Sequence, residues 1–152
     1  MMTTAIPEND PSFDPRSIEE RNKELVLGIS DQGWHPKQLT GKCSPDYQIH
    51  FGGEDLDLDS LMEFMESIHK ALPDLQFTIN DVIAEGDRVV TRWTASGTHL
   101  ADFQGVPPTR KPVRFTGITI TRIEDGVIAE DWEEVDQLNF AQQFGAFSSD
   151  MF

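Results

Sequence analysis

The segment 130–136 reads EDWEEVD and gathers several acids around one tryptophan. A carboxyl group buried among apolar side chains has a raised pKa, because burial disfavours its charged form. Such a group can take a proton from a substrate and later return it. Glu133 and Asp136, beside Trp132, are the candidates for this role. Residues three apart in a strand point to opposite faces unless a bulge intervenes, so we expect at least one of them to face solvent.

Histidine is the second residue type that could take part in catalysis. His50 lies in a short apolar stretch, where it could hydrogen-bond a substrate carbonyl oxygen or, equally, the protein backbone. His99 follows a strand-like stretch and is expected to anchor a loop, while His35 and His69 are expected to be exposed. These four histidines lack the spacing of a zinc or iron site, so the sequence predicts no metal centre.

Aromatic side chains are the expected walls of a pocket. The chain has ten Phe and three Trp against one Tyr, a composition that favours an interior or cavity lined by apolar rings. Arg92 could point inward, to pair with Glu133 or Asp136 or to bind a substrate carboxylate, or outward to solvent. The predicted substrate-binding residues are Trp34, Arg92, Trp93, Phe103, Phe115, Thr119 and Trp132.

The charge of the chain limits its partners. It has 152 residues with 27 acidic and 12 basic side chains, which gives a net charge of −15. Nucleic acids and anionic membranes would be repelled, so neither is an expected partner. The single cysteine, Cys43, permits no internal disulfide and has no nearby histidine, so we expect an unreactive thiol. Residues 1–14 lack the features of a secretion signal, and we expect a cytoplasmic location.

The length of the chain and the absence of an internal linker sequence indicate a single domain. Residues 1–15 contain three prolines and are expected to form a disordered or draped tail. Residues 16–152 contain no linker that would divide them, and their number is typical of one domain.

Helical patterns are clearest in the first half of that domain. Ser17 and Glu20 have the spacing of a capping box, which predicts a helix that begins there. Apolar residues recur at i, i+3, i+4, i+7 and i+11 from Leu61, which predicts a second helix capped by Asp57 or Asp59. A short amphipathic segment is expected near the end of the chain, over residues 138–147.

Strand patterns dominate the second half. Two Gly-containing turns, at 85–87 and 124–126, separate stretches rich in β-branched residues. Helices followed by a strand meander predict an α+β fold, in which a curved antiparallel sheet packs on the N-terminal helices as an open cone. The expected strands are 47–51, 75–83 (with one irregularity), 88–97, 113–123 and 127–135.

Several segments together resemble the SnoaL-like polyketide cyclase family, also called ester cyclases. The likeness is close over the second half of the chain and looser over the first. The segments, in order, are PDL at 73–75, DVIAEGDRVV at 81–90, RWTASGTH at 92–99, GVPPT at 105–109, RIEDGVIAEDW at 122–132 and QQFG at 142–145.

This resemblance implies the cone-shaped, cystatin-like fold of nuclear transport factor 2, shared by ketosteroid isomerases and limonene-epoxide hydrolases. It implies an intramolecular aldol condensation without a metal or organic cofactor, and a homodimer. It also implies an acid that works as general acid and base, which aligns best with Glu133 and next best with Asp136. The family's assisting histidine would lie in 117–121, where this chain has none, and His50 could replace it.

The leading hypothesis is a cofactor-independent enzyme that cyclises or isomerises a small apolar or polyketide-like carbonyl compound in an internal pocket. One alternative is epoxide-hydrolase-like or dehydratase chemistry in the same pocket. Another, from a different class, is a non-catalytic ligand-binding or dimeric scaffold protein. A buried acid with a raised pKa would favour an enzyme, whereas exposed Glu133 and Asp136 would favour binding.

Overall fold

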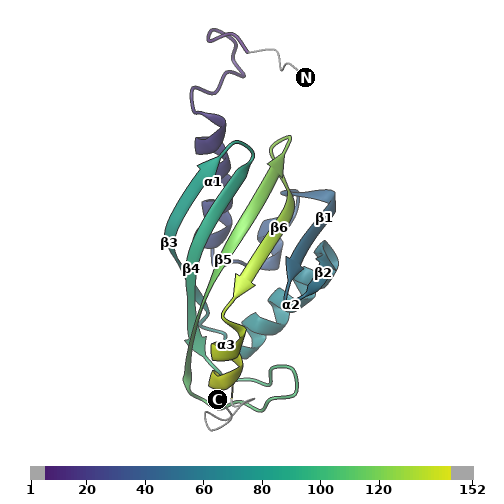
Figure 1. Ribbon diagram of the computed structural model, residues 1–152, viewed down its shortest axis with the longest axis vertical. Coiled ribbons are helices and arrows are strands. Elements are labelled where there is room, and N and C mark those ends of the chain that lie inside the picture. Colours follow the sequence, from purple (N-terminus) through teal and green to yellow (C-terminus); the bar gives the residue numbers. More distant parts are fainter. Residues whose placement is uncertain (1–5, 145–152) are drawn as a thin grey trace.

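The computed structural model describes residues 6–144; residues 1–5 and 145–152 lie outside the described part. A curved sheet with helices packed against it gives the α+β architecture predicted from the sequence (Figure 1). The elements, in chain order, are α1 (Ile18–Asp31), the short 3-10 helix η1 (Pro36–Leu39), β1 (Cys43–Phe51), β2 (Glu54–Asp57), α2 (Leu58–Ala71), β3 (Gln76–Glu85), β4 (Arg88–Thr98), β5 (Pro112–Glu124), β6 (Val127–Val135) and α3 (Gln137–Gln143).

Both long helices begin at capping residues that the sequence contains. The Ser17 side chain accepts a hydrogen bond from the backbone N–H of Glu20 at 3.1 Å, at the start of α1. Asp57 accepts one from the N–H of Ser60 at 2.8 Å, so Asp57 rather than Asp59 caps α2. A side-chain acceptor satisfies a backbone donor that has no partner within the helix, and the caps therefore fix where both helices start.

The six strands follow the order β2-β1-β6-β5-β4-β3. Neighbouring strands are antiparallel as expected, except that β1 and β6 run parallel. This parallel pair joins the first and last strands and sets residues 48–51 beside 130–133. Strand β2 is not among the strands predicted from the sequence. Gly52 and Gly53, directly after the predicted strand 47–51, adopt positive φ angles of 62° and 79° and turn the chain back into β2.

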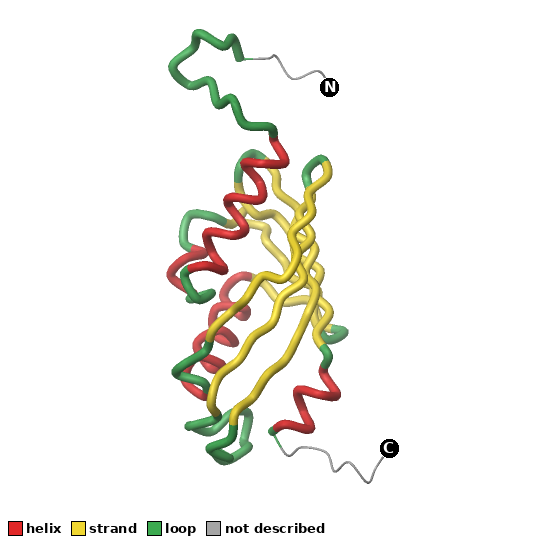
Figure 2. Tube along the Cα trace, turned by 90° about the vertical axis from the view of Figure 1, so that its left-hand side faces the viewer, coloured by secondary structure: helices red, strands yellow, loops and turns green. Residues whose placement is uncertain are grey.

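Strands β3 to β6 form the predicted meander. Gly86 and Gly126 have positive φ angles of 58° and 79° in its two tight turns. The irregularity expected in the first strand is a register shift between Ile79 and Asp81. Because a bulge strengthens the local twist of a strand, it contributes to the curvature visible in Figure 2.

The helices lie against the sheet in two places. Helices α1 and α2 cover one face, and α3 lies at one end of the sheet (Figures 1 and 2). Residues 6–15, part of the predicted tail, extend away from the sheet (Figure 2). Helix α3 begins one residue before the predicted segment 138–147 and otherwise overlaps it, and the residues of that segment after 144 lie outside the described part. The Phe140 ring of α3 contacts Phe103, with 5.7 Å between ring centroids.

A core tryptophan, Trp93, lies over a glycine. Trp93 of β4 pairs in register with Gly117 of β5 and is only 6% exposed. Its ring also contacts Phe77 and Phe115, at centroid distances of 5.5 and 6.0 Å. A Cβ atom at Gly117 would lie 2.3 Å from Cζ2 of Trp93, so the indole occupies the space that any side chain would need.

Replacing Gly117 with alanine is therefore expected to destabilise the protein. The added methyl group must displace a packed indole, which typically costs about 1–3 kcal/mol. Gly28→Ala in α1 is the matched control, because its Cβ would meet no atom within 4 Å. Alanine favours a helix interior over glycine by up to about 1 kcal/mol, so this variant should be as stable as wild type or more so. Urea unfolding followed by circular dichroism measures both, and equal stabilities would contradict the packing described.

Candidate active site

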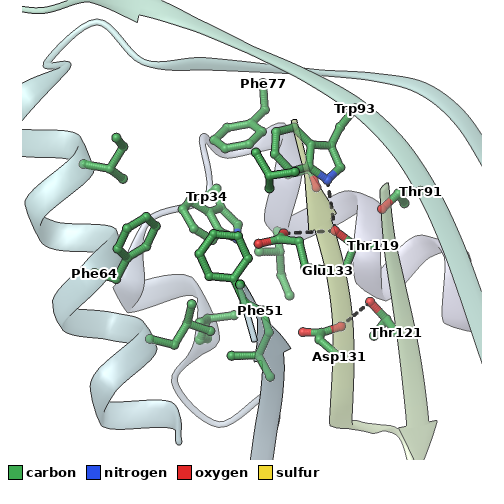
Figure 3. A pocket seen from close by; sticks show the side chains of 18 of the residues that line it. Trp34, Phe51, Phe64, Phe77, Thr91, Trp93, Thr119, Thr121, Asp131 and Glu133 are labelled. Atoms are coloured by element: carbon green, nitrogen blue, oxygen red, sulfur yellow. Dashed lines mark hydrogen bonds between the residues drawn. The ribbon is translucent and has the colours of Figure 1, made fainter. Parts of the chain in front are cut away.

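A cavity of about 410 Å³ lies between the curved sheet and helices α1 and α2 (Figure 3). Ligand pockets in proteins commonly span about 300–1,000 Å³, so a small organic molecule would fit. Most of the lining side chains are apolar, and many are aromatic. Gly52, Gln104 and Gln137 are exposed members of the lining and mark its mouth.

Glu133 points into this cavity from β6 (Figure 3). Its Oε1 accepts a hydrogen bond from the Thr119 hydroxyl at 3.0 Å. The Thr119 oxygen in turn accepts a hydrogen bond from the Trp93 indole N–H at 2.9 Å. The indole can only donate and an ionised carboxylate can only accept, so the direction of both bonds is fixed when Glu133 is ionised. The second carboxylate oxygen, Oε2, remains available to a ligand.

The surroundings of Glu133 favour its protonated form. Burial first, and the nearby charge of Asp131 second, raise its pKa to about 7. The hydrogen bond from Thr119 acts in the opposite direction, because it stabilises the carboxylate. Glu133 is therefore a carboxyl group that changes charge near neutral pH, as a general acid–base catalyst must.

A second acid, Asp131, lines the same cavity and was missed by the sequence analysis. Its Oδ2 accepts a hydrogen bond from the Tyr47 hydroxyl and its Oδ1 one from the Thr121 hydroxyl, both at 2.6 Å. Burial raises the pKa of Asp131, although both hydroxyl groups act to lower it. The sequence held a signal for this residue, since side chains two apart in a strand share a face and Glu133 follows two residues later.

Tyr47 and Cys43, which also line the cavity, keep their protons at neutral pH. Burial and the charge of Asp131 raise the pKa of Tyr47 far above its ordinary value, so the phenol acts as a hydrogen-bond donor. Burial also raises the pKa of the Cys43 thiol to about 11. Since the thiolate is the nucleophilic form, this agrees with the expected unreactive cysteine.

The cavity brings together six of the residues predicted from the sequence. Thr119 contacts Glu133 directly, and Trp93 contacts Thr119. The aromatic walls include a Trp34–Phe77 contact at 5.3 Å between ring centroids. The six residues are Glu133, Thr119, Trp34, Trp93, Phe103 and Phe115.

His50 and Trp132 are not among the residues that line the cavity, contrary to the sequence-based expectation. They are paired across β1 and β6, and Trp132 directly precedes the inward-facing Glu133, so strand alternation turns them to the other face. There His50 lies between two acids, Asp55 at 2.5 Å and Glu130 at 2.6 Å. Hydrogen bonds to Asp55 first and Glu130 second raise the pKa of His50. This histidine therefore links the edge strand β2 to β6.

Arg92 and Asp136 also differ from expectation. Arg92 alternates with the inward-facing Trp93, lies outside the cavity lining, and its Nε donates to Asp81 at 2.6 Å. Asp136 follows the end of β6 and caps α3, accepting a hydrogen bond from the N–H of Asn139 at 3.1 Å. Neither side chain lines the cavity, because one faces outward from its strand and the other is used at a helix start.

The remaining histidines have structural contacts. His99 is fully buried and its Nδ1 accepts a hydrogen bond from the N–H of Thr109 at 3.1 Å, which anchors the loop after β4. His69 was expected to be exposed but is half-buried, with Nε2 3.0 Å from the carbonyl oxygen of Trp34. Over residues 6–144, no group of three or more His, Cys, Asp or Glu is placed to hold a metal ion.

Comparisons with known proteins agree with this architecture. The model of the family described as SnoaL-like polyketide cyclase matches residues 25–144. AclR from Streptomyces galilaeus, provisionally assigned as a hydroxylase, is 28% identical with a TM-score of 0.77, and the match covers 86% of this chain and 99% of that one. IdmH from Streptomyces antibioticus, provisionally assigned as a polyketide cyclase, is 28% identical with a TM-score of 0.70, covering 82% and 98%.

A third solved structure extends the likeness in fold. It is a provisionally assigned SnoaL-like polyketide cyclase from Jannaschia sp. CCS1, 24% identical with a TM-score of 0.76, and the match covers 90% of this chain and all (100%) of that one. The cone-shaped fold like that of nuclear transport factor 2 is thereby confirmed. A search of curated proteins gave no match. Within residues 6–144, no helix has the length and apolar character that crossing a membrane requires.

The raised pKa of Glu133 predicts a pH-dependent stability difference between wild type and Glu133→Gln. In the unfolded chain Glu133 has its ordinary pKa of 4.5, whereas in the folded chain its pKa is about 7. The folded state binds more protons between these values, so wild type loses stability as pH rises through this window. Glutamine cannot titrate. The variant should therefore gain up to about 3 kcal/mol relative to wild type between pH 4 and pH 8.

Urea unfolding at pH 4, 6 and 8 measures this difference. Glu134→Gln is the matched control, because Glu134 is the next residue of β6 and is exposed. Its stability relative to wild type should change little over the same range. A pH-independent difference between wild type and Glu133→Gln would mean that Glu133 titrates in the folded protein as it does in the unfolded one.

Proposed function

The chain belongs to the SnoaL-like polyketide cyclase family, and we propose that it is a cofactor-independent acid–base enzyme that cyclises or isomerises a small, largely apolar carbonyl compound. The family and the likeness to IdmH support an enzymatic role of the cyclase or isomerase type. The different assignments of AclR and IdmH mean that the reaction has to be argued from the site itself.

The observation that carries this proposal is the carboxyl group of Glu133. It faces a largely apolar cavity, its pKa is raised to about 7, and among residues 6–144 only one of its oxygens has a hydrogen-bond partner. A base with a pKa near the working pH combines a useful ionised fraction with a useful affinity for the proton. The Thr119 hydroxyl, which itself accepts a hydrogen bond from Trp93, donates to Oε1. Oε2 is therefore the oxygen left for the substrate.

The reaction then proceeds with one carboxyl group. Oε2 of ionised Glu133 takes a proton from the carbon next to the substrate carbonyl, and the electron pair of the broken C–H bond moves onto the carbonyl oxygen as an enolate. In a cyclisation, the enolate carbon attacks a second carbonyl carbon and Glu133 returns its proton to the new alkoxide. In an isomerisation, Glu133 returns the proton to another carbon of the enolate.

The alternative of epoxide hydrolysis has less support. In limonene-epoxide hydrolases, which share this fold, an Asp-Arg-Asp set activates water, and in this chain Arg92 would have to supply the arginine. Arg92 pairs with Asp81 outside the cavity lining, so this set is not assembled. A non-catalytic binding role remains the outcome if Glu133 proves unable to move protons.

Exchange of carbon-bound protons in heavy water tests the proposed base. The probe is 4-phenylcyclohexanone, an uncharged apolar ketone small enough for a cavity of about 410 Å³. We expect wild type to accelerate the loss of its α-proton signals by NMR, with a rate that rises with pH around 7, because the carboxylate is the active form. Glu133→Gln should reduce the catalysed rate about 100-fold or more.

Glu134→Gln is again the control, since it removes an exposed carboxylate from the same strand, and it should exchange protons at the wild-type rate. Loss of activity in both variants, or in neither, would contradict the assignment of the base to Glu133. The homodimer, the cytoplasmic location and the N-terminal tail over 1–15 stay predictions from the sequence.

A further inference from the structure

Among residues 6–144, acidic but not basic side chains line the cavity. Asp131 and Glu133 face its interior, and the exposed Glu54 belongs to its lining near the mouth. Its lining residues, all within the described range 6–144, include no Lys, Arg or His. A negatively charged ligand would meet uncompensated negative charge inside a poorly solvated space, whereas a cation would find partners there.

Three arginines of the sheet have partners outside the cavity. Nε of Arg92 lies 2.6 Å from Asp81, and Nε of Arg122 lies 3.3 Å from Glu130. Arg88 lies over the ring of Trp132, 4.9 Å from its centroid. In the part of the chain that the structure describes, no ion pair reaches either cavity acid. The charge of these acids is therefore compensated either by a proton or by a ligand.

Asp131 is fixed by two hydrogen bonds but can accept a further hydrogen bond from a ligand. One hydroxyl group binds each of its oxygens, from Tyr47 and from Thr121, at 2.6 Å. An ionised carboxylate offers about four acceptor positions, so lone pairs remain on both oxygens. Asp131 lies two residues before Glu133 on β6, farther from the mouth residue Gln137. It is therefore placed to receive the end of a ligand that has passed Glu133.

Aromatic rings line the space beside Glu133. Trp34 contacts Phe77 at 5.3 Å and Phe77 contacts Trp93 at 5.5 Å, measured between ring centroids, and all three line the cavity (Figure 3). Such walls bury an apolar body, and their faces attract cations. The net charge of −15 over the whole chain also favours the approach of a cation.

We propose that the ligand of this cavity is an organic cation, a protonated amine on an apolar body. Its ammonium N–H groups donate to Asp131, and its body lies against the wall formed by the rings of Trp34, Phe77 and Trp93. This deepens the proposed function, on which it rests, because a carbonyl compound bound in this way passes beside Oε2 of Glu133. Over residues 6–144 no group of three or more potential ligands is placed for a metal ion, which favours an organic cation.

Three ligands with one apolar body and different charges test the proposal. They are 2-(2-naphthyl)ethylamine, 2-(2-naphthyl)ethanol and 2-naphthylacetate, titrated into the full chain by isothermal calorimetry at pH 8 and low salt. We expect the amine to bind about tenfold more tightly than the alcohol, and the carboxylate more weakly than both. Asp131→Asn should remove the preference for the amine while the alcohol still binds, which also reports that the cavity is intact.

Glu134→Gln controls for attraction by the general negative surface, since it removes one exposed charge and should leave the preference for the amine unchanged. The proposal is overturned if 2-naphthylacetate binds as tightly as the amine, or if Asp131→Asn keeps the preference. If this variant does not fold, the order of the three ligands on wild type decides alone. The ketone used for proton exchange is uncharged, so that experiment tests Glu133 as a base independently of any preference for cations. Either proposal can therefore fail without affecting the test of the other.

Discussion

Removal of two carboxyl groups from water is the constraint on which the centre of this molecule depends. A buried charge is costly unless hydrogen bonds or an opposite charge offset the loss of hydration. Asp131 receives two hydroxyl groups, from strands on either side of β6, whereas Glu133 receives one. This difference in hydrogen bonding separates their roles, because Asp131 has partners on both oxygens and Glu133 keeps an oxygen for a ligand.

The packing of Trp93 on Gly117 helps to position the Glu133 carboxylate. Gly117 has no side chain, so the Trp93 ring lies flat against β5 and its N–H reaches Thr119, two residues further along that strand. Thr119 then holds Glu133. A glycine in one strand thus determines the position of a carboxylate in the next, and the aromatic core and the candidate base form one continuous arrangement.

Local patterns in the sequence predicted most of the fold, because caps, turns and periodicity act over a few residues. The start of α1 at Ser17 and the meander belong to this class. Glu133 was ranked first among the candidate acids by the family resemblance, and no local pattern decided whether it or Asp136 would face the pocket. The errors arose where the face of a strand or a distant partner decides. Arg92 and Trp132 each alternate with an inward-facing neighbour, so they could not line the cavity as well. Tyr47 became part of the site through the parallel pairing of β1 with β6, which no local pattern specifies.

That parallel pairing also has a consequence for the order of folding. The hydrogen bond between Tyr47 and Asp131 joins residues 84 positions apart, whereas the meander pairs strands that follow one another directly. Closing a long loop costs more chain entropy than closing a short hairpin, so contacts of high sequence separation form slowly. The chain must therefore complete β6 and return it to β1 before either acid is enclosed. A nascent or partly unfolded chain has carboxylates of ordinary acidity, and the reactive form of Glu133 exists only in the finished fold.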